Sequence, residues 1–132
     1  MRVVLDANVI VSAVIGSGAP AEILRRWKQG SFELIVSEHL LTELAATLAR
    51  PKLSRRLRAG EASALVELLR DGGTPTPDPS EPPRRSRDSA DDYLIALAES
   101  AEAMLVSGDR DLLELGHEFP IVSPREFLAL LD

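Results

Sequence analysis

Short apolar runs alternate with amphipathic stretches along the chain. Four runs are typical of buried strands, at Val3 to Leu5, Phe32 to Val36, Ala103 to Val106 and Ile121 to Val122. Helices are predicted at Pro20 to about Trp27, Ser37 to Pro51, Glu61 to Arg70, Ser89 to Glu102 and Asp109 to Leu115. Strands that alternate with helices predict an α/β fold, with helices on both faces of a central, mainly parallel sheet.

Cap and turn residues set several boundaries of these elements. Ser37 can cap the helix that follows it, and Pro51 disfavours helix at the residue before it. Ser123 and Glu126 have the spacing of a capping box, which predicts a last helix. Residues 74–86 hold five of the nine prolines and predict a loop. Because strand and helix signals resume directly after it, we expect one domain over residues 1–132.

The composition excludes several kinds of site. The chain has no Cys, which excludes disulfides, thiolate metal sites and cysteine nucleophiles. His39 and His117 are its only histidines, so a His-based metal site is not expected. The sequence leads directly into a strand-like run, and no apolar stretch approaches the roughly 20 residues that span a bilayer. We therefore expect a cytoplasmic protein with no membrane segment.

The charge distribution is uneven. A net charge of −6 argues against binding nucleic acid by overall attraction. Basic residues nevertheless gather in two clusters, Arg50 to Arg58 and Arg84 to Arg87. Each cluster has two interpretations: an ordinary solvated surface, or a set of phosphate contacts beside an acidic metal centre.

Acidic residues follow two of the predicted strands. Asp6 comes directly after Val3 to Leu5, and Asp109 follows Ser107 and Gly108 at the end of another strand. Each is also a plausible turn or helix-cap residue. Because ligands of open α/β sheets bind outside the carboxyl ends of the strands, we expect the two carboxylates to converge there.

The helix predicted from Ser89 carries a third acid. Asp92 lies among apolar residues that leave almost no polar face, and a buried carboxylate is costly unless it is paired or bound to metal. Asp88 lies four residues earlier on the same side of the helix. Asp88 and Asp91 can also be interpreted as ordinary acids of a first helical turn.

Clustered Asp and Glu, without Cys and with little His, match a hard divalent cation such as Mg²⁺ or Mn²⁺. Carboxylates on either side of one or two such ions, about 4 Å apart, are suited to hydrolysis of a phosphodiester. The aromatic residues form no row on which bases could stack.

Four segments in order resemble the PIN-domain family, and specifically the VapC-like toxin ribonucleases of bacterial toxin–antitoxin pairs. They are VVLDAN, SEHLLTELAATLARPK, DDYLIALA and LVSGDRDLL, and PIVSPREFLALL resembles the ending of one subgroup of toxin components. The resemblance covers nearly the whole chain. It implies a three-layer α/β/α fold with metal-binding and catalytic roles for Asp6, Glu43, Asp92 and Asp109. Supporting positions are Asn8, Asp88, Ser107 and Asp111.

The resemblance also implies Mg²⁺- or Mn²⁺-dependent endoribonuclease activity, an RNA substrate, homodimerisation and inhibition by a cognate antitoxin. Two alternatives stay open: a PIN fold that binds or regulates without catalysis, and a nuclease directed at DNA. A response-regulator receiver needs a lysine after a late strand, and the only lysines are Lys28 and Lys52. The sequence therefore argues against that class.

Overall fold

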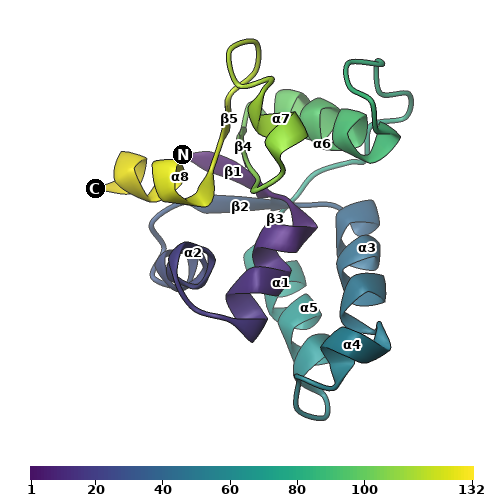
Figure 1. Cartoon of the computed structure of the whole chain (residues 1–132), viewed down its shortest axis with the longest axis vertical. Coiled ribbons are helices and arrows are strands. Elements are labelled where there is room, and N and C mark those ends of the chain that lie inside the picture. Colours follow the sequence, from purple (N-terminus) through teal and green to yellow (C-terminus); the bar gives the residue numbers. More distant parts are fainter.

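A five-stranded parallel sheet forms the centre of the computed structural model, which describes all 132 residues (Figure 1). The strands are β1 (Arg2–Leu5), β2 (Glu33–Val36), β3 (Thr74–Pro75), β4 (Met104–Val106) and β5 (Ile121–Val122). They lie in the order β3-β2-β1-β4-β5, and all four pairings are parallel. The α/β fold with a mainly parallel sheet, predicted from the sequence, is confirmed.

Eight helices connect and cover these strands. They are α1 (Ala7–Ile15), α2 (Ala19–Lys28), α3 (Glu38–Leu48), α4 (Pro51–Ser54), α5 (Glu61–Gly72), α6 (Ser89–Ser100), α7 (Arg110–Leu113) and α8 (Pro124–Leu131). None of them, taken singly, is long and apolar enough to cross a membrane; α1 and α2 reach that length and apolarity only as a pair, bent by 95°.

The core has two parts, one on each face of the sheet. Val3 and Leu5 of β1 point into a cluster with α1, α2, α3, α5 and α8, whereas Val4 between them points into a cluster with α6. This alternation follows from the two-residue period of a strand, and it explains why the three buried residues of β1, Val3 to Leu5, are all apolar. Figure 1 shows α6 and α7 on the opposite side of the sheet from α1, α2 and α5.

Three elements were not expected from the sequence. Helix α1 follows β1 directly, although its Val- and Ile-rich sequence favours a strand. Pro51 occupies the first turn of the short helix α4, three residues after the last residue of α3. Strand β3 lies within the predicted loop and pairs only with β2, an edge position in which Pro75 needs no donor on its free side.

The predicted caps of two helices are confirmed. The Ser37 hydroxyl accepts a hydrogen bond from the Leu40 amide at 3.2 Å at the start of α3. Ser123 and Glu126 form the reciprocal capping box at the start of α8. The N-caps of α1, α6 and α7 are instead aspartates, namely Asp6, Asp88 and Asp109, and all three take part in the site described next.

Candidate active site at the carboxyl edge of the sheet

The neighbouring strands β1 and β4 end side by side, with Leu5 paired to Val106. The next residue in each chain segment is polar and buried: Asp6 is 9% exposed and Ser107 is fully buried. The Asp6 amide continues the sheet by donating to the Val106 carbonyl at 3.0 Å. The register of two apolar strands therefore fixes both polar side chains at one point of the sheet edge.

Hydrogen bonds connect Asp6 to Asp109 through Ser107. The Ser107 hydroxyl donates to Oδ2 of Asp6 at 2.9 Å and accepts from the Asp109 amide at 2.9 Å. Asp6 and Asp109 also cap α1 and α7, since their Oδ1 atoms accept from the amides of Asn8 and Asp111. Asp6 and Asp109 are thus helix-cap residues and also members of the candidate site.

Burial raises the pKa of Asp6 above its ordinary value. The hydrogen bonds from Ser107 and Asn8 lower it in part, and the charge of Asp109 raises it again, so the net direction is upward. The influence of Asp109 on Asp6 means that the two carboxylates lie close enough to repel each other. The expected convergence of these two strand-end acids is therefore present in the structure.

Asp91, in the first turn of α6, is the third member of this centre. Its side chain is buried, at 7% exposure, and it receives no hydrogen bond. Burial is the largest cause of a rise in its pKa to about 6, and the charges of Asp109, Asp88, Asp6 and Asp111 contribute to that rise in this order. Among the carboxylates with a shifted pKa, Asp91 is the one that several acidic neighbours act on. We call Asp6, Asp91 and Asp109 the acidic centre.

Asp92 was expected in this position, and the structure places it elsewhere. It is equally buried, at 5% exposure, but its Oδ1 accepts from the Arg85 amide at 2.9 Å and the Ser86 hydroxyl at 2.8 Å. Burial raises the pKa of Asp92, but these hydrogen bonds and the charge of Arg84 outweigh it, and the net direction is downward. Asp92 thus faces the loop before α6 rather than the acidic centre.

The correction has a simple geometric reason. Residues three and four positions apart lie on the same side of a helix, so Asp91 and Asp92 both satisfy the spacing from Asp88. From spacing alone, Asp91 can equally be an ordinary acid of the first helical turn. The sequence nevertheless contains an indication that Asp91 is buried, because Asp91 lies among the same apolar residues as Asp92.

Glu43 lies in the second turn of α3 and is exposed. It forms no ion pair, and its charge acts on the pKa of the Tyr93 hydroxyl, which burial, Asp78 and Glu43 together raise. Its charge does not contribute to the pKa of Asp6. The structure therefore does not bring Glu43 into the acidic centre as closely as Asp91.

The supporting positions surround the centre. Asp88 caps α6 by accepting from the Ala90 amide at 2.9 Å, and Asp111 lies in the first turn of α7. Asn8 and Gly108 line a pocket of about 380 Å³, to which the acidic centre contributes Asp109. Asp109 is thus accessible from solvent through this pocket.

The donor chemistry fits a hard divalent cation. All three side chains of the acidic centre offer carboxylate oxygens, and none of them forms an ion pair with Lys or Arg. As placed, no three acidic or histidine side chains lie close enough together to share one ion. A cation at this point would relieve the repulsion that raises the pKa of Asp91 and would draw the carboxylates inward.

Comparison with known proteins agrees with this fold. An uncharacterised protein from Methanocaldococcus jannaschii is 26% identical over an alignment 141 positions long, which covers 97% of this chain and 90% of the relative. The crystal structure of PAE2754 from Pyrobaculum aerophilum is similar, with a TM-score of 0.65 and 19% identity over 99% of this chain and 95% of that one.

A second similar structure is that of FitAB bound to a DNA fragment, with a TM-score of 0.57 and 17% identity over 92% of this chain and 94% of that one. At these identities the likeness shows the fold alone. A sequence model of the PIN domain matches residues 2–111, which include every member of the acidic centre. The chain therefore belongs to the PIN-domain family.

Proposed function

We propose that this protein is a divalent-metal-dependent endoribonuclease, with Mg²⁺ or Mn²⁺ as its cofactor. The PIN domain is a nuclease fold, which supports hydrolysis of a phosphodiester. The observation that carries the proposal is Asp91, a buried carboxylate with no hydrogen-bond donor and with Asp6 and Asp109 acting on it. Such a group is costly to fold unless a proton or a cation neutralises it.

In this proposal Asp6, Asp91 and Asp109 hold the metal, and Ser107 fixes the orientation of the Asp6 carboxylate through its hydrogen bond. A bound divalent ion would supply a water of lowered pKa and would stabilise the charge on the leaving oxygen. Glu43 stays a proposed ligand on the basis of the family resemblance. Asn8 lines the pocket through which a substrate reaches Asp109.

We further propose that the protein is the toxin of a toxin–antitoxin pair, acts as a homodimer and is inhibited by a cognate antitoxin. The resemblance of its four acidic segments to VapC-like toxins supports these partners. The likeness to FitAB, a protein that has been solved bound to DNA, is consistent with assembly into a larger complex. Co-expression with the gene encoded directly upstream would test this, because an antitoxin should suppress toxicity and co-purify.

A second candidate function is a PIN fold that binds or regulates without catalysis. One observation favours it, namely that no three acidic side chains are placed to share an ion. The two functions predict different results with RNA in the presence of added metal.

The test is cleavage of single-stranded RNA by purified protein with Mg²⁺, with Mn²⁺ and with a chelator. We expect metal-dependent cleavage by the wild type and by Asp71→Asn, an exposed acid on α5 that makes no ion pair. Asp109→Asn should lose the activity. If wild-type protein cuts no RNA with either metal but cuts DNA, the nuclease is directed at DNA. If it cuts neither, the binding function replaces the proposal.

A further inference from the structure

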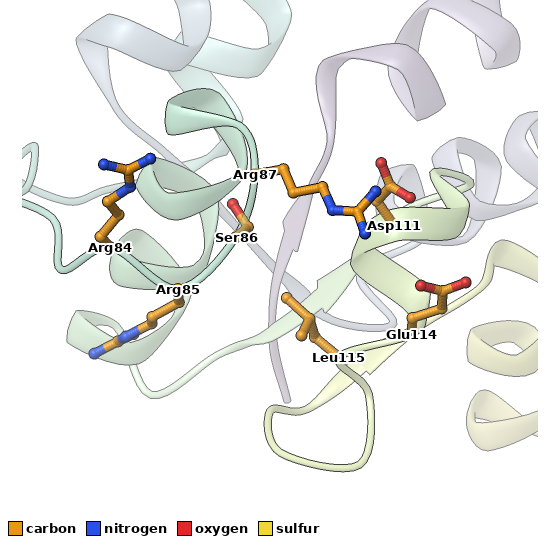
Figure 2. Close-up of a pocket in the computed structure, with 7 residues that line it drawn as sticks. All are labelled: Arg84, Arg85, Ser86, Arg87, Asp111, Glu114 and Leu115. Atoms are coloured by element: carbon orange, nitrogen blue, oxygen red, sulfur yellow. The ribbon is translucent and has the colours of Figure 1, made fainter.

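The loop between the proline-rich segment and α6 carries three arginines. We call residues Arg84–Arg87 the arginine loop. It forms one wall of a pocket of about 470 Å³, and Asp111, Glu114 and Leu115 form the opposite wall (Figure 2). The second basic cluster of the chain, at Arg50 to Arg58, has no comparable acidic neighbour from α7.

A buried carboxylate holds the arginine loop in shape. Oδ1 of Asp92 accepts both the Arg85 amide and the Ser86 hydroxyl, at 2.9 and 2.8 Å. Because Asp92 is 5% exposed, its charge is stabilised mainly by this loop. Burial of an unpaired carboxylate is strongly unfavourable, so the buried charge of Asp92 depends on the hydrogen bonds from this loop. Such an arrangement is not expected for a segment with no role.

The three arginines have different surroundings. Arg85 forms an ion pair with Glu99 and lies over the Phe119 ring, with its guanidinium carbon 5.3 Å from the ring centroid. Its side chain is therefore used within the fold. Arg84 and Arg87 are exposed and form no ion pair or side-chain hydrogen bond. These two cations are available to a ligand.

Asp111 connects the pocket with the surroundings of the acidic centre. Asp111 lines the pocket, and its charge also acts on Asp91. Figure 2 shows the Arg87 guanidinium extending toward the Asp111 carboxylate, and Arg84 at the far end of the loop. A chain of phosphates with one phosphate at the acidic centre would therefore reach the arginine loop with a neighbouring one.

The carboxylates of the opposite wall restrict where an anion can lie. Asp111 and Glu114 repel a phosphate, whereas Arg84 and Arg87 attract it. A phosphate is therefore favoured on the side of the arginine loop, away from α7. Phosphate contacts of this kind position a nucleic acid and do not read its sequence.

We propose that the arginine loop binds a backbone phosphate of single-stranded RNA beside the bond that is cleaved, with Arg84 and Arg87 as contacts and Asp92 as a positioning residue. The inference rests on the proposed ribonuclease function for the choice of RNA. It assigns Asp92 to shaping the loop rather than to holding metal.

Binding is the direct test, because it can be measured without turnover. The probe is a fluorescein-labelled, phosphorothioate-linked single-stranded RNA, titrated with protein in Mg²⁺ over a series of salt concentrations. The double variant Arg84→Gln/Arg87→Gln should bind about tenfold more weakly or worse. Its plot of log affinity against log salt should be shallower by about 1.4, or about 0.7 for each lost phosphate contact. Arg58→Gln, in the turn before α5, is the matched control and should bind like the wild type.

Two variants test the positioning role of Asp92. Asp92→Ala removes the acceptor for Arg85 and Ser86 and should weaken RNA binding toward the level of the double variant. Asp92→Asn keeps an acceptor oxygen and should recover most of the binding, with KM raised more than kcat is lowered. Loss of kcat in Asp92→Asn with unchanged RNA affinity would overturn the positioning role.

Cleavage assays separate this inference from the proposed function. Arg84→Gln/Arg87→Gln should raise KM and leave kcat nearly unchanged. A wild type that binds RNA through these arginines but never cleaves it contradicts the ribonuclease and supports the loop. A wild type that cleaves RNA while the double variant binds it equally well contradicts the loop alone. Absence of RNA binding by the wild type, or arginine-dependent binding of DNA only, overturns the inference.

Discussion

Two adjacent aspartates of α6 are expected to have opposite effects on stability when each is replaced by asparagine. Four carboxylates raise the pKa of Asp91, which accepts no hydrogen bond, whereas Asp92 accepts two hydrogen bonds from the arginine loop. Asparagine has nearly the same size as aspartate but no charge. Asp91→Asn should therefore stabilise the metal-free protein at pH 7, and Asp92→Asn should not.

The size of the Asp91 effect follows from its pKa, which burial and the neighbouring carboxylates raise from 3.8 to about 6. Two pKa units correspond to about 3 kcal/mol, which solvent on the open side of the site reduces to about 1–2 kcal/mol. Loss of a negative charge near the start of α6 costs about 0.3–1 kcal/mol. The net gain is about 1 kcal/mol, or roughly 3–6 °C in Tm.

The direction of the Asp91 pKa shift determines how the free energy of unfolding changes with pH. Because the pKa of Asp91 is higher in the folded state, its contribution to stability is complete below its ordinary pKa of 3.8 and is lost as the pH rises through about 6. Wild type and Asp91→Asn should therefore unfold alike near pH 4 and diverge toward neutral pH. The net pKa of Asp92 is lowered, so its contribution is present at neutral pH and is lost in acid.

The assay is chemical and thermal unfolding, in a chelator, from pH 4 to pH 8. A stabilised Asp92→Asn together with an unchanged or destabilised Asp91→Asn would refute the assignment of Asp91 to the acidic centre. Equal stabilisation by both variants would refute the role of Asp92 in holding the arginine loop.

Three further predictions concern metal and local structure. Millimolar Mg²⁺ or Mn²⁺ should raise the Tm of the wild type, because a ligand bound only by the folded state stabilises that state. Asp109→Asn should show a smaller rise in Tm. Equal Tm values of the wild type with and without metal would count against the site. Tyr93→Phe should lower the free energy of unfolding by about 1–2 kcal/mol, because the Tyr93 hydroxyl is hydrogen-bonded to both Ser37 and Asp78. Denaturant unfolding measures this difference, and an unchanged free energy of unfolding would contradict these contacts. Ser123→Ala should cost about 1 kcal/mol through loss of the α8 capping box, with Ser123→Asn expected to restore stability in the same measurement.

Much of the fold could be predicted because it depends on patterns that are local in sequence. Buried strands β1, β2 and β4 follow from short apolar runs, and the capping box of α8 follows from the spacing of Ser123 and Glu126. Helix α1 could not be predicted in this way. Its Val- and Ile-rich sequence favours a strand, and it becomes helical because Asp6 caps it and its apolar side chains pack in the core.

The proline-rich segment was the least predictable region. The sequence predicted a loop with no assigned role, but Asp78 in this segment bonds the Tyr93 hydroxyl and accepts from the His39 amide at 3.3 Å. Strand β3 lies in the same segment. These contacts join residues far apart in the chain, so no local spacing pattern could indicate them.

At the site, the strand-end rule located Asp6 and Asp109, and the structure shows them linked by Ser107. The choice between Asp91 and Asp92 could not be made from spacing, because the helical period accepts either residue. The structure distinguishes them by their partners: acidic neighbours for Asp91, and the arginine loop for Asp92.

The central claim is that Asp6, Asp91 and Asp109 together hold the metal that supports RNA hydrolysis. Its most direct test is single-turnover cleavage of RNA at saturating Mg²⁺ or Mn²⁺ and saturating protein, with Asp91→Asn and Asp92→Asn compared side by side. We expect Asp91→Asn to slow cleavage on the order of 100-fold or more, and Asp92→Asn to cleave at close to the wild-type rate. Cleavage by Asp91→Asn at the wild-type rate, with Asp92→Asn inactive, would contradict it.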